Sequence, residues 1–160
     1  MIKKIQFAAW LYILNTALLL YSTSGLAACS VSASGVAYGG YIAASPLPTD
    51  GVGTVTVGCS GTISLLVGYD ILLSAGSSGS YSVREMYNGP DSLQYNLYTD
   101  LLRTSIWGDG TGGSDSLGGS ILIQLLVTIY NTHTVYGRIF PGQYVSGGLY
   151  ADTITVTVNY

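Results

Sequence analysis

Few side chains in this sequence could do chemistry, and none stands in a known catalytic pattern. His133 is the single histidine, and we interpret its segment, Asn131-Thr132-His133-Thr134, as an exposed turn between two strands. A serine hydrolase needs a histidine beside a serine and an acid, and the sequence has no G-x-S-x-G nucleophile motif. No pair of carboxylates is marked out for glycoside chemistry. We therefore expect no catalytic residues and no enzymatic activity.

Asp109 and Asp115 flank a glycine-rich segment, residues 108–115, which composition predicts to be a loop. Two carboxylates on one loop could bind calcium, but their spacing matches neither an EF-hand nor a repeat-type calcium motif. The loop also lacks a lysine and does not lead into a helix, so it is a poor phosphate site. We expect no bound metal and no cofactor.

The first segment predicts export. Lys3 and Lys4 precede the apolar run Ile5–Leu20, and Gly25 and Ala27 suit the −3 and −1 positions of a cleavage site before Ala28. The alternative, a transmembrane anchor, is weaker because the run is shorter than the ~20 residues that span a bilayer. We expect a signal peptide at residues 1–27 and one domain at residues 28–160.

Without the signal peptide the chain keeps three arginines against eight acidic residues, so its net charge is three minus eight, or −5. No basic patch remains, and nucleic acid is therefore not an expected partner.

Two cysteines, Cys29 and Cys59, lie in segments where every second residue is apolar, and both fall on the apolar face. An even number of cysteines in an exported protein predicts a disulfide, which an antiparallel or inter-sheet pairing of the two strands would permit. A competing interpretation is that Leu26-Ala27-Ala28-Cys29 is a lipobox. In that case Cys29 would carry a lipid anchor, and Cys59 would remain a free thiol.

Short alternating runs separated by glycine and serine predict an all-β protein, most simply an immunoglobulin-like two-sheet sandwich. The same spacing also fits a jelly roll or a barrel. Ile121–Tyr130 is the longest apolar run, and we expect it to be a central core strand. The other expected strands are residues 29–38, 53–60, 65–74, 81–87, 92–99, 136–140 and 150–160.

The last of these strands alternates strictly from Thr153 onward. One face carries Ile154, Val156, Val158 and Tyr160, and the other face is polar. No hairpin turn follows, so no later segment can pair with the far edge of this strand. Because an open strand edge is usually covered, we expect a neighbour from an earlier strand or from another chain.

Several blocks in order along the chain resemble the spore coat protein U domain, a family that includes the pilins of archaic chaperone–usher fimbriae. The resemblance spans nearly all of residues 28–160. It rests on Cys29-x-Val31-x-Ala33, Val36-Ala37-Tyr38-Gly39-Gly40-Tyr41, Val57-x-Cys59, Tyr69-x-Ile71-x-Leu73-Ser74-x-Gly76, Arg84-x-Met86, Leu93-x-Tyr95-Asn96-Leu97-Tyr98-x-Asp100, Trp107-Gly108-Asp109-Gly110, Tyr136-Gly137-Arg138-Ile139, Gln143 and the terminal Gly148-x-Tyr150-x-Asp152-Thr153-x-x-Val156-Thr157-Val158-x-Tyr160.

The resemblance implies an incomplete immunoglobulin-like sandwich that lacks its final strand. In such pilins a periplasmic chaperone lends a strand, and a neighbouring subunit replaces it after assembly through an outer-membrane usher. Ile154, Val156, Val158 and Tyr160 would then line one wall of the acceptor groove. The resemblance also implies a disulfide between Cys29 and Cys59.

One departure from the family pattern concerns the donor strand, an alternating apolar stretch that polymerising pilins carry before the first cysteine. Cleavage before Ala28 would leave none here. We therefore expect a cell-surface fimbrial subunit that accepts a strand without giving one, at the end of the fibre, in adhesion or biofilm formation. The alternative is a free-standing secreted coat protein or adhesin that binds a surface ligand.

Overall fold

The structure is a computed structural model that describes residues 26–160. The predicted signal peptide, residues 1–27, lies outside the described residues except for its last two positions. The described chain consists of β-strands and one 3₁₀ turn, η1 (Gly76–Ser78). No helix in this part of the chain is both long and apolar enough to cross a membrane.

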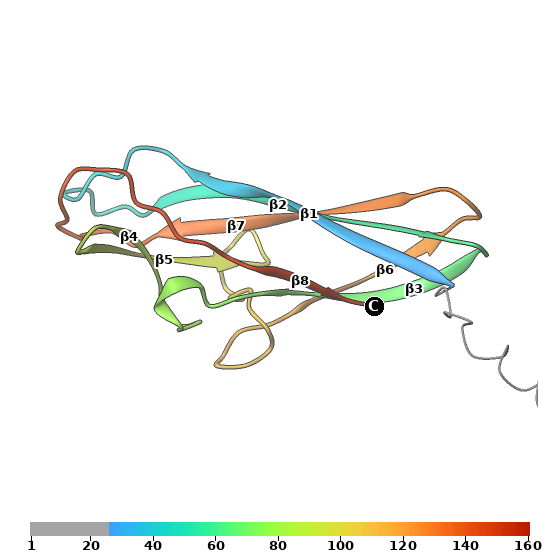
Figure 1. Ribbon diagram of the computed structural model, residues 1–160. Helices are drawn as coiled ribbons and strands as arrows, with labels where there is room; N and C mark the ends of the chain where they lie inside the picture. Colours follow the sequence, from blue (N-terminus) through green and yellow to red (C-terminus); the bar gives the residue numbers. More distant parts are fainter. Residues whose placement is uncertain (1–25) are drawn as a thin grey trace, which may run out of the picture.

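The strands form two antiparallel sheets packed face to face (Figure 1). A five-stranded sheet has the order β1-β2-β7-β5-β4, and a three-stranded sheet has the order β6-β3-β8. This arrangement confirms the predicted immunoglobulin-like sandwich. The strands are β1 (Ala27–Tyr38), β2 (Thr49–Gly61), β3 (Leu65–Leu73), β4 (Arg84–Asn88), β5 (Asp91–Tyr98), β6 (Leu117–Ile123), β7 (Ile129–Ile139) and β8 (Val156–Asn159).

The core lies between the sheets and takes alternate residues from each strand, as period-two patterning requires. On β2 the buried side chains are Val55, Val57 and Cys59, and on β3 they run from Val67 to Leu73 at every second position. Trp107 is fully buried beneath them, and its indole Nε1–H donates to the carbonyl of Ile71 at 3.0 Å. The indole therefore fixes the loop after β5 against the three-stranded sheet.

The predicted disulfide is confirmed. Cys29 and Cys59 are direct cross-strand partners in the β1–β2 ladder, with their Cα atoms 4.1 Å apart. The sulfur of Cys29 is therefore bonded to Cys59 and is not available to a lipid. Both cysteines face the core, which is what the apolar alternation of the two segments predicts.

The expectation that Ile121–Tyr130 is one central strand is wrong. β6 ends at Ile123, the chain turns through residues 124–128, and β7 begins at Ile129. Leu126 adopts a left-handed backbone with φ of 59°, and its side chain is 83% exposed. The run breaks because its two halves belong to different sheets, so the chain must cross between the layers here. No glycine or proline marks that crossing in the sequence.

The expectation that residues 131–134 form an exposed turn is also wrong. His133 lies within β7, opposite Val55 of β2, and its side chain is partly buried between the sheets. The His133 Nε2 atom lies 2.8 Å from the Tyr69 hydroxyl, which also accepts from the Asn131 amide at 3.1 Å. Burial lowers the pKa of His133. The alternation of β7 continues through these polar residues, because they are satisfied by one another inside the sandwich.

Candidate functional site: a groove between two open strand edges

Strand β8 is the outer strand of the three-stranded sheet. It pairs with β3 on one side, from Leu73↔Val156 to Asp70↔Asn159, and no strand of the described chain pairs with its other side. Backbone N–H and C=O groups along such an edge have no ladder partner. The far edge of the last strand is therefore open, as the sequence predicts.

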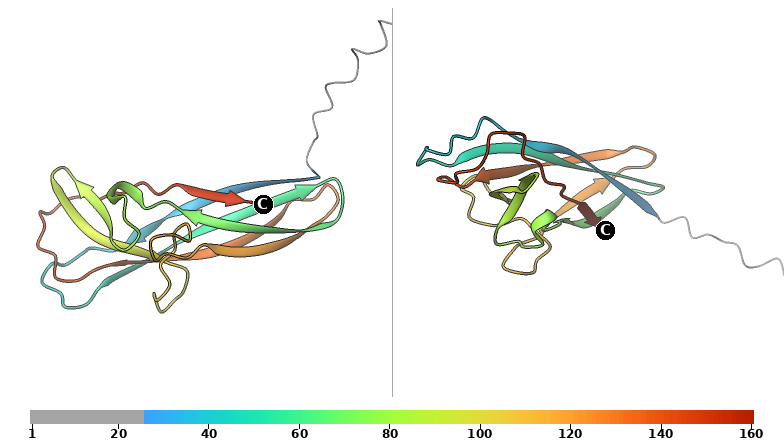
Figure 2. Two further views of the ribbon diagram at one scale, coloured as in Figure 1. Left: turned by 90° about the horizontal axis from the view of Figure 1, so that it is seen from below. Right: turned by 60° about the vertical axis from the view of Figure 1, so that its left-hand side comes forward.

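Strand β1 supplies the second open edge. It is the outer strand of the five-stranded sheet and pairs only with β2 within the described residues. β1 and β8 lie on the same side of the sandwich, one in each layer (Figure 1, Figure 2), but no ladder joins them. The register of β1 shifts between Ser34 and Ala37, which marks a bulge along this edge. Two unpaired edges thus face each other across the opening between the sheets.

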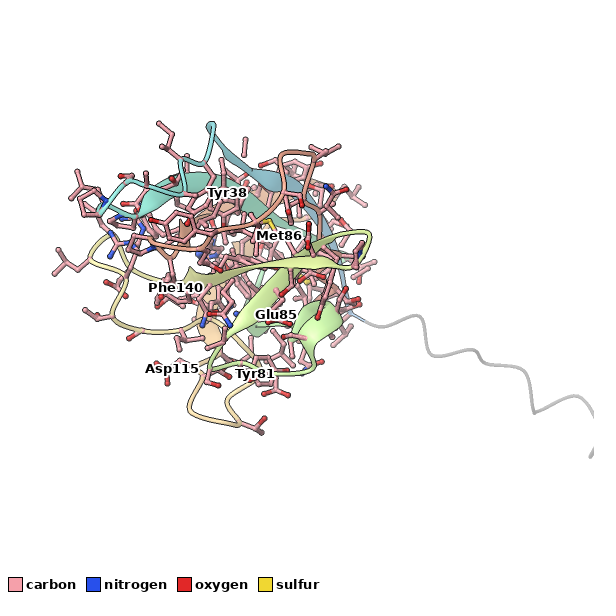
Figure 3. All side chains as sticks on the ribbon, turned by 90° about the vertical axis from the view of Figure 1, so that its left-hand side faces the viewer. Tyr38, Tyr81, Glu85, Met86, Asp115 and Phe140 are labelled. Carbon is pink, nitrogen blue, oxygen red and sulfur yellow. A yellow bond between two sulfur atoms is a disulfide. The ribbon has the colours of Figure 1, made fainter. Side chains whose placement is uncertain are left out.

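A cavity of about 710 Å³ opens between these edges. Its first wall is the second half of β1, residues 33–38, with the chain that follows as far as Tyr41. Its second wall is the segment 148–156 that leads into β8. The floor is one end of the core, built from the buried side chains of Val55, Leu73, Met86, Leu93, Tyr95, Leu97, Val135 and Ile139. In Figure 3, which looks at this end of the molecule, Tyr38 and Met86 lie between the ribbons of β1–β2 and those of β4–β5, which are the two ends of the five-stranded sheet.

Of the four residues that the sequence assigns to the groove, Ile154 and Val156 line it. Val158 is partly buried against the core but does not line the cavity. Tyr160 is 60% exposed and borders a separate shallow depression beside Gly68 and Gly119. The structure therefore brings two of the four residues into the groove, and only Val156 and Val158 belong to β8 itself.

Sequence reasoning missed two parts of the groove, the β1 wall and the segment Gly148–Asp152. The Gly-x-Tyr-x-Asp spacing in this segment is the signal that could have indicated the second wall, because Asp152 anchors it. The Asp152 carboxylate accepts from Ser77 N at 2.9 Å, Ser77 Oγ at 2.7 Å and the Tyr95 hydroxyl at 2.7 Å. These bonds tie the wall to η1 on one side and to β5 on the other.

Two further contacts hold the same segment in place. The backbones of Ala151 and Tyr87 exchange two hydrogen bonds, at 2.9 and 3.2 Å, and Ser74 N donates to Thr155 O at 2.9 Å. Burial is the main cause that raises the pKa of Tyr95, and its bond to Asp152 adds to the effect. The Tyr95 hydroxyl therefore remains a donor to Asp152 throughout the ordinary pH range.

Arg84 supports the floor from below. Its side chain is fully buried, and its guanidinium donates to the carbonyls of Ser74 and Trp107 and to Asn96 Oδ1 at 2.6 Å. The Asn96 amide in turn donates to the carbonyls of Tyr81 and Ser82. Burial lowers the pKa of Arg84, and the neutral acceptors around it satisfy its donors. Asn96 of the Tyr-Asn-Leu-Tyr block and Trp107 of the Trp-Gly-Asp-Gly block are thus framework residues.

Tyr38 closes the far end of the β1 wall. Its ring packs over Gly51 and Gly137, where any side chain would collide with it, and meets Tyr95 edge-to-face at 6.2 Å between ring centroids. Its hydroxyl is buried without a hydrogen-bond partner in the described part of the chain. Burial raises the pKa of Tyr38, so the hydroxyl stays protonated.

In the glycine-rich loop, residues 108–115, the Asp109 side chain stabilises the conformation of the loop itself. Asp109 Oδ1 accepts from Thr111 N at 2.9 Å and from Thr111 Oγ1, and these bonds lower the pKa of Asp109. Asp115 pairs through its backbone with Trp107, and in Figure 3 it lies with Tyr81 away from the groove. No cluster of three or more His, Cys, Asp or Glu side chains occurs among residues 26–160.

The groove is suited to an extended peptide. An incoming strand could pair its backbone with the open edges of β1 and β8 while its alternate side chains enter the apolar floor. Its lining is dominated by aliphatic and aromatic side chains, and the Asp152 carboxylate in it is held by Ser77 and Tyr95.

Comparison with known proteins agrees with this geometry. The family described as "Spore Coat Protein U domain" matches residues 15–157. The chain is 31% identical over 115 residues to Protein U of Myxococcus xanthus, covering 69% of this chain and 60% of that protein. It thus spans about three-fifths of the length of this relative.

Among solved structures, the chain resembles the crystal structure of the CsuC–CsuE chaperone–tip adhesion subunit pre-assembly complex from archaic chaperone-usher Csu pili of Acinetobacter baumannii. The TM-score is 0.54 at 21% identity, over 84% of this chain and 40% of that chain. This likeness shows a shared fold, whereas the family match covers most of the sequence. The chain therefore belongs to the spore coat protein U domain family.

Proposed function

We propose that this protein is a non-enzymatic structural subunit of a surface fimbria, and that its groove accepts a strand from another protein. The observation that carries the proposal is the apolar cavity between the open edges of β1 and β8. Core side chains such as Leu73, Leu93 and Ile139 form its floor, so the alternate side chains of an inserted strand would pack directly against the core.

The energetics support a requirement for a partner strand. Three or four large apolar side chains entering the groove would each contribute about 1.5–3 kcal/mol by leaving water. The sum is comparable with the net stability of a whole domain, roughly 5–15 kcal/mol. The subunit alone is therefore expected to be marginally stable and prone to aggregate, and a periplasmic chaperone is the expected first occupant.

The proposed partners are that chaperone, an outer-membrane usher and a neighbouring subunit that donates a strand. The solved neighbour is itself described as a chaperone–tip subunit complex. The proposed route leads from export through the periplasm to the cell surface. Genes for a chaperone and an usher beside this one would support the fimbrial role. Their absence would favour the alternative of a free-standing coat protein or adhesin.

The proposed place in the fibre is terminal. Cleavage before Ala28, as the sequence predicts, would leave β1 starting at the first residues of the exported chain, because Ala27 already pairs with Gly61. With that cleavage, the pairing of this segment inside its own sheet would leave no strand of residues 28–160 free to insert into a neighbour. The subunit would then end a fibre, where it could contact a surface in adhesion.

The test is a thermal melt of residues 28–160 with increasing amounts of an alternating apolar peptide from a companion subunit. The expected result is a saturable rise in melting temperature. Val156→Asp, which places a charge in the groove, should abolish the rise, while Thr157→Asp on the outer face of the same strand should preserve it. A stable monomer whose melting temperature ignores every such peptide would show that the groove needs no partner.

A further inference from the structure

The outer face of the five-stranded sheet, on the side away from the core, carries regular rows of hydroxyl side chains. We call this surface the hydroxyl face. It is formed by Ser30, Ser32 and Ser34 of β1, Thr54 and Thr56 of β2, and Tyr130, Thr132, Thr134 and Tyr136 of β7. In Figure 1, β2 and β7 lie above β3 and β8, so the hydroxyl face is the upper side of the upper layer.

The hydroxyl groups are in register across three strands. Two rows of direct cross-strand partners run Ser34–Thr54–Thr134 and Ser32–Thr56–Thr132. The hydroxyl oxygens of Ser34 and Thr54 lie 2.9 Å apart, as do those of Thr56 and Thr132. Each hydroxyl has one proton and two acceptor lone pairs, so a pair that shares one hydrogen bond keeps a donor and further acceptors for a ligand. Neighbours within a row lie about 4.8 Å apart and the rows about 6.6 Å apart, so the face presents donors and acceptors on a regular grid.

An aromatic ring lies at one end of this grid. Tyr130 is the direct partner of Gly58 in β2, and a Cβ atom added to Gly58 would lie 2.6 Å from the Tyr130 ring. The ring therefore leans across β2 and covers Gly58, which is buried although it has no side chain. Tyr130 is nevertheless 65% exposed, so the side of the ring that faces away from the sheet is open to solvent.

The hydroxyl face carries no charged side chain. Residues 26–49, 51–69 and 116–137 include no Asp, Glu, Lys or Arg, whereas an ordinary protein surface mixes charges of both signs. Charges begin at the far end of β7, where Arg138 pairs with Asp50 at 2.8 Å and the Arg103 guanidinium lies 5.9 Å from the centre of the Tyr136 ring. The grid between Tyr130 and Tyr136 is thus neutral over a length of about 20 Å.

We propose that the hydroxyl face binds a neutral, extended polysaccharide chain that lies along β7. The flat side of a sugar ring presents C–H groups, which are slightly positive and are attracted to the negative face of an aromatic ring such as Tyr130. The edge of a sugar ring presents hydroxyls, which need both donors and acceptors, and the serine and threonine rows supply both. Carboxylate or sulfate groups on a charged polysaccharide would lose water over this grid without gaining an ionic partner. Because β-sheets twist, the face fits one flexible chain better than the plane of a crystal.

The hydroxyl face is separate from the groove. The groove opens between the sheets, whereas the side chains of Tyr130, Thr132 and Thr134 lie on the opposite side of β7 and line neither of the two described depressions. Ser34 alone borders both surfaces, because it lies at the bulge in β1. A strand that fills the groove therefore leaves the β7 part of the hydroxyl face accessible.

The experiment is affinity electrophoresis of the folded chain, with its groove occupied by a donor peptide if stability requires it. One native gel contains hydroxyethyl cellulose, a soluble neutral polymer, and the other contains carboxymethyl cellulose, which has the same backbone with added carboxylates. Tyr130→Ser removes the ring and Tyr130→Phe keeps it, while Thr132→Val combined with Thr134→Val removes two hydroxyls and keeps the β-branched shape. The matched control is Tyr144→Ser, which removes a tyrosine that is 84% exposed outside the hydroxyl face.

The expected result is retardation by hydroxyethyl cellulose alone, weakened at least fivefold in Tyr130→Ser and in the threonine variant. Tyr130→Phe and Tyr144→Ser should bind as the native chain does, and the melting temperature of each variant shows whether it is folded. If Tyr130→Ser does not fold, the threonine variant decides.

Unchanged retardation in the folded variants that lack the ring or the hydroxyls would overturn the proposal. So would equal retardation by carboxymethyl cellulose, or sedimentation showing a native dimer that Tyr130→Ser dissolves, since the face would then bind a second copy of the chain. None of these outcomes depends on whether the groove accepts a strand.

Discussion

The Asp152 carboxylate should be the main anchor of the second groove wall, and the loss of stability caused by its removal can be calculated from its hydrogen bonds. It accepts three hydrogen bonds from Ser77 and Tyr95. A hydrogen bond to a charged group contributes roughly 1.5–3 kcal/mol when buried, and the half-buried Asp152 side chain should gain about 1 kcal/mol from each. Asp152→Ala is therefore expected to lower the free energy of unfolding by about 3 kcal/mol.

The assay is thermal unfolding followed by tryptophan fluorescence. Trp107 is the only tryptophan outside the predicted signal peptide, and it is fully buried. For a domain of this size, 3 kcal/mol corresponds to a fall in melting temperature of roughly 10 °C. The matched control is Asp115→Ala. The Asp115 side chain is exposed and makes no hydrogen bond within residues 26–160, so its removal should change the free energy of unfolding by less than about 0.5 kcal/mol.

A double-mutant cycle distinguishes loss of the Asp152 hydrogen bonds from a general effect of removing one negative charge. Tyr95→Phe removes one of the three hydrogen bonds that Ser77 and Tyr95 donate to Asp152. It should therefore lower the free energy of unfolding by less in the Asp152→Ala background than in the native chain, with a difference of about 1 kcal/mol or more. Peptide binding in the groove should weaken with Asp152→Ala, because the Gly148–Asp152 wall would loosen. Additive losses of stability in the double mutant would show that Asp152 does not anchor the wall. A melting temperature of Asp152→Ala within 2 °C of the native chain would show the same.

Three more expectations follow from the fold. Intact-mass measurement should show one disulfide, with a two-dalton gain on reduction. Replacing Cys29 and Cys59 by serine should cost about 3–4 kcal/mol for a loop with a separation of 30 residues, and a lipid mass on Cys29 would contradict the assignment. Because burial lowers the pKa of His133 below its unfolded value, the unfolded state binds more protons as pH falls below about 6.5. Stability should therefore drop between pH 7.5 and 5.5 in the native chain and stay flatter in His133→Gln; parallel pH profiles would refute this. Asp109→Ala combined with Asp115→Ala should leave the melting temperature insensitive to calcium, as in the native chain, and a calcium-dependent rise that the double change removes would contradict it.

The elements that the sequence predicts well are those whose burial follows strict alternation. Val55, Val57 and Cys59 face the core in the β-sheet, and the cysteines pair where the apolar faces of two antiparallel strands meet. The inward face of β8 and of the residues that lead into it follows for the same reason: Ile154, Val156 and Val158 are all partly buried. In these strands the alternation of apolar and polar side chains is a property of the segment itself, so the buried face can be predicted from the sequence alone.

The features that the sequence did not predict correctly depend on partners far away along the chain. Leu125 and Leu126 continue an apolar run, but the chain must cross between sheets there, and this requirement is set by the pairing of β6 with β3 and of β7 with β2. His133 looks like a turn residue until Tyr69, 64 residues away, supplies its hydrogen bond. The β1 wall and the Asp152 anchor are likewise products of the tertiary arrangement, which no single segment encodes.

The central claim is that an incoming strand pairs with the open edges of β1 and β8. Hydrogen–deuterium exchange of residues 28–160, with and without a saturating donor peptide, tests it most directly. The account predicts new protection in residues 33–38 and in β8, little change in β7, which is already paired on both sides, and no effect in Val156→Asp. Peptide binding without added protection of either edge would contradict it.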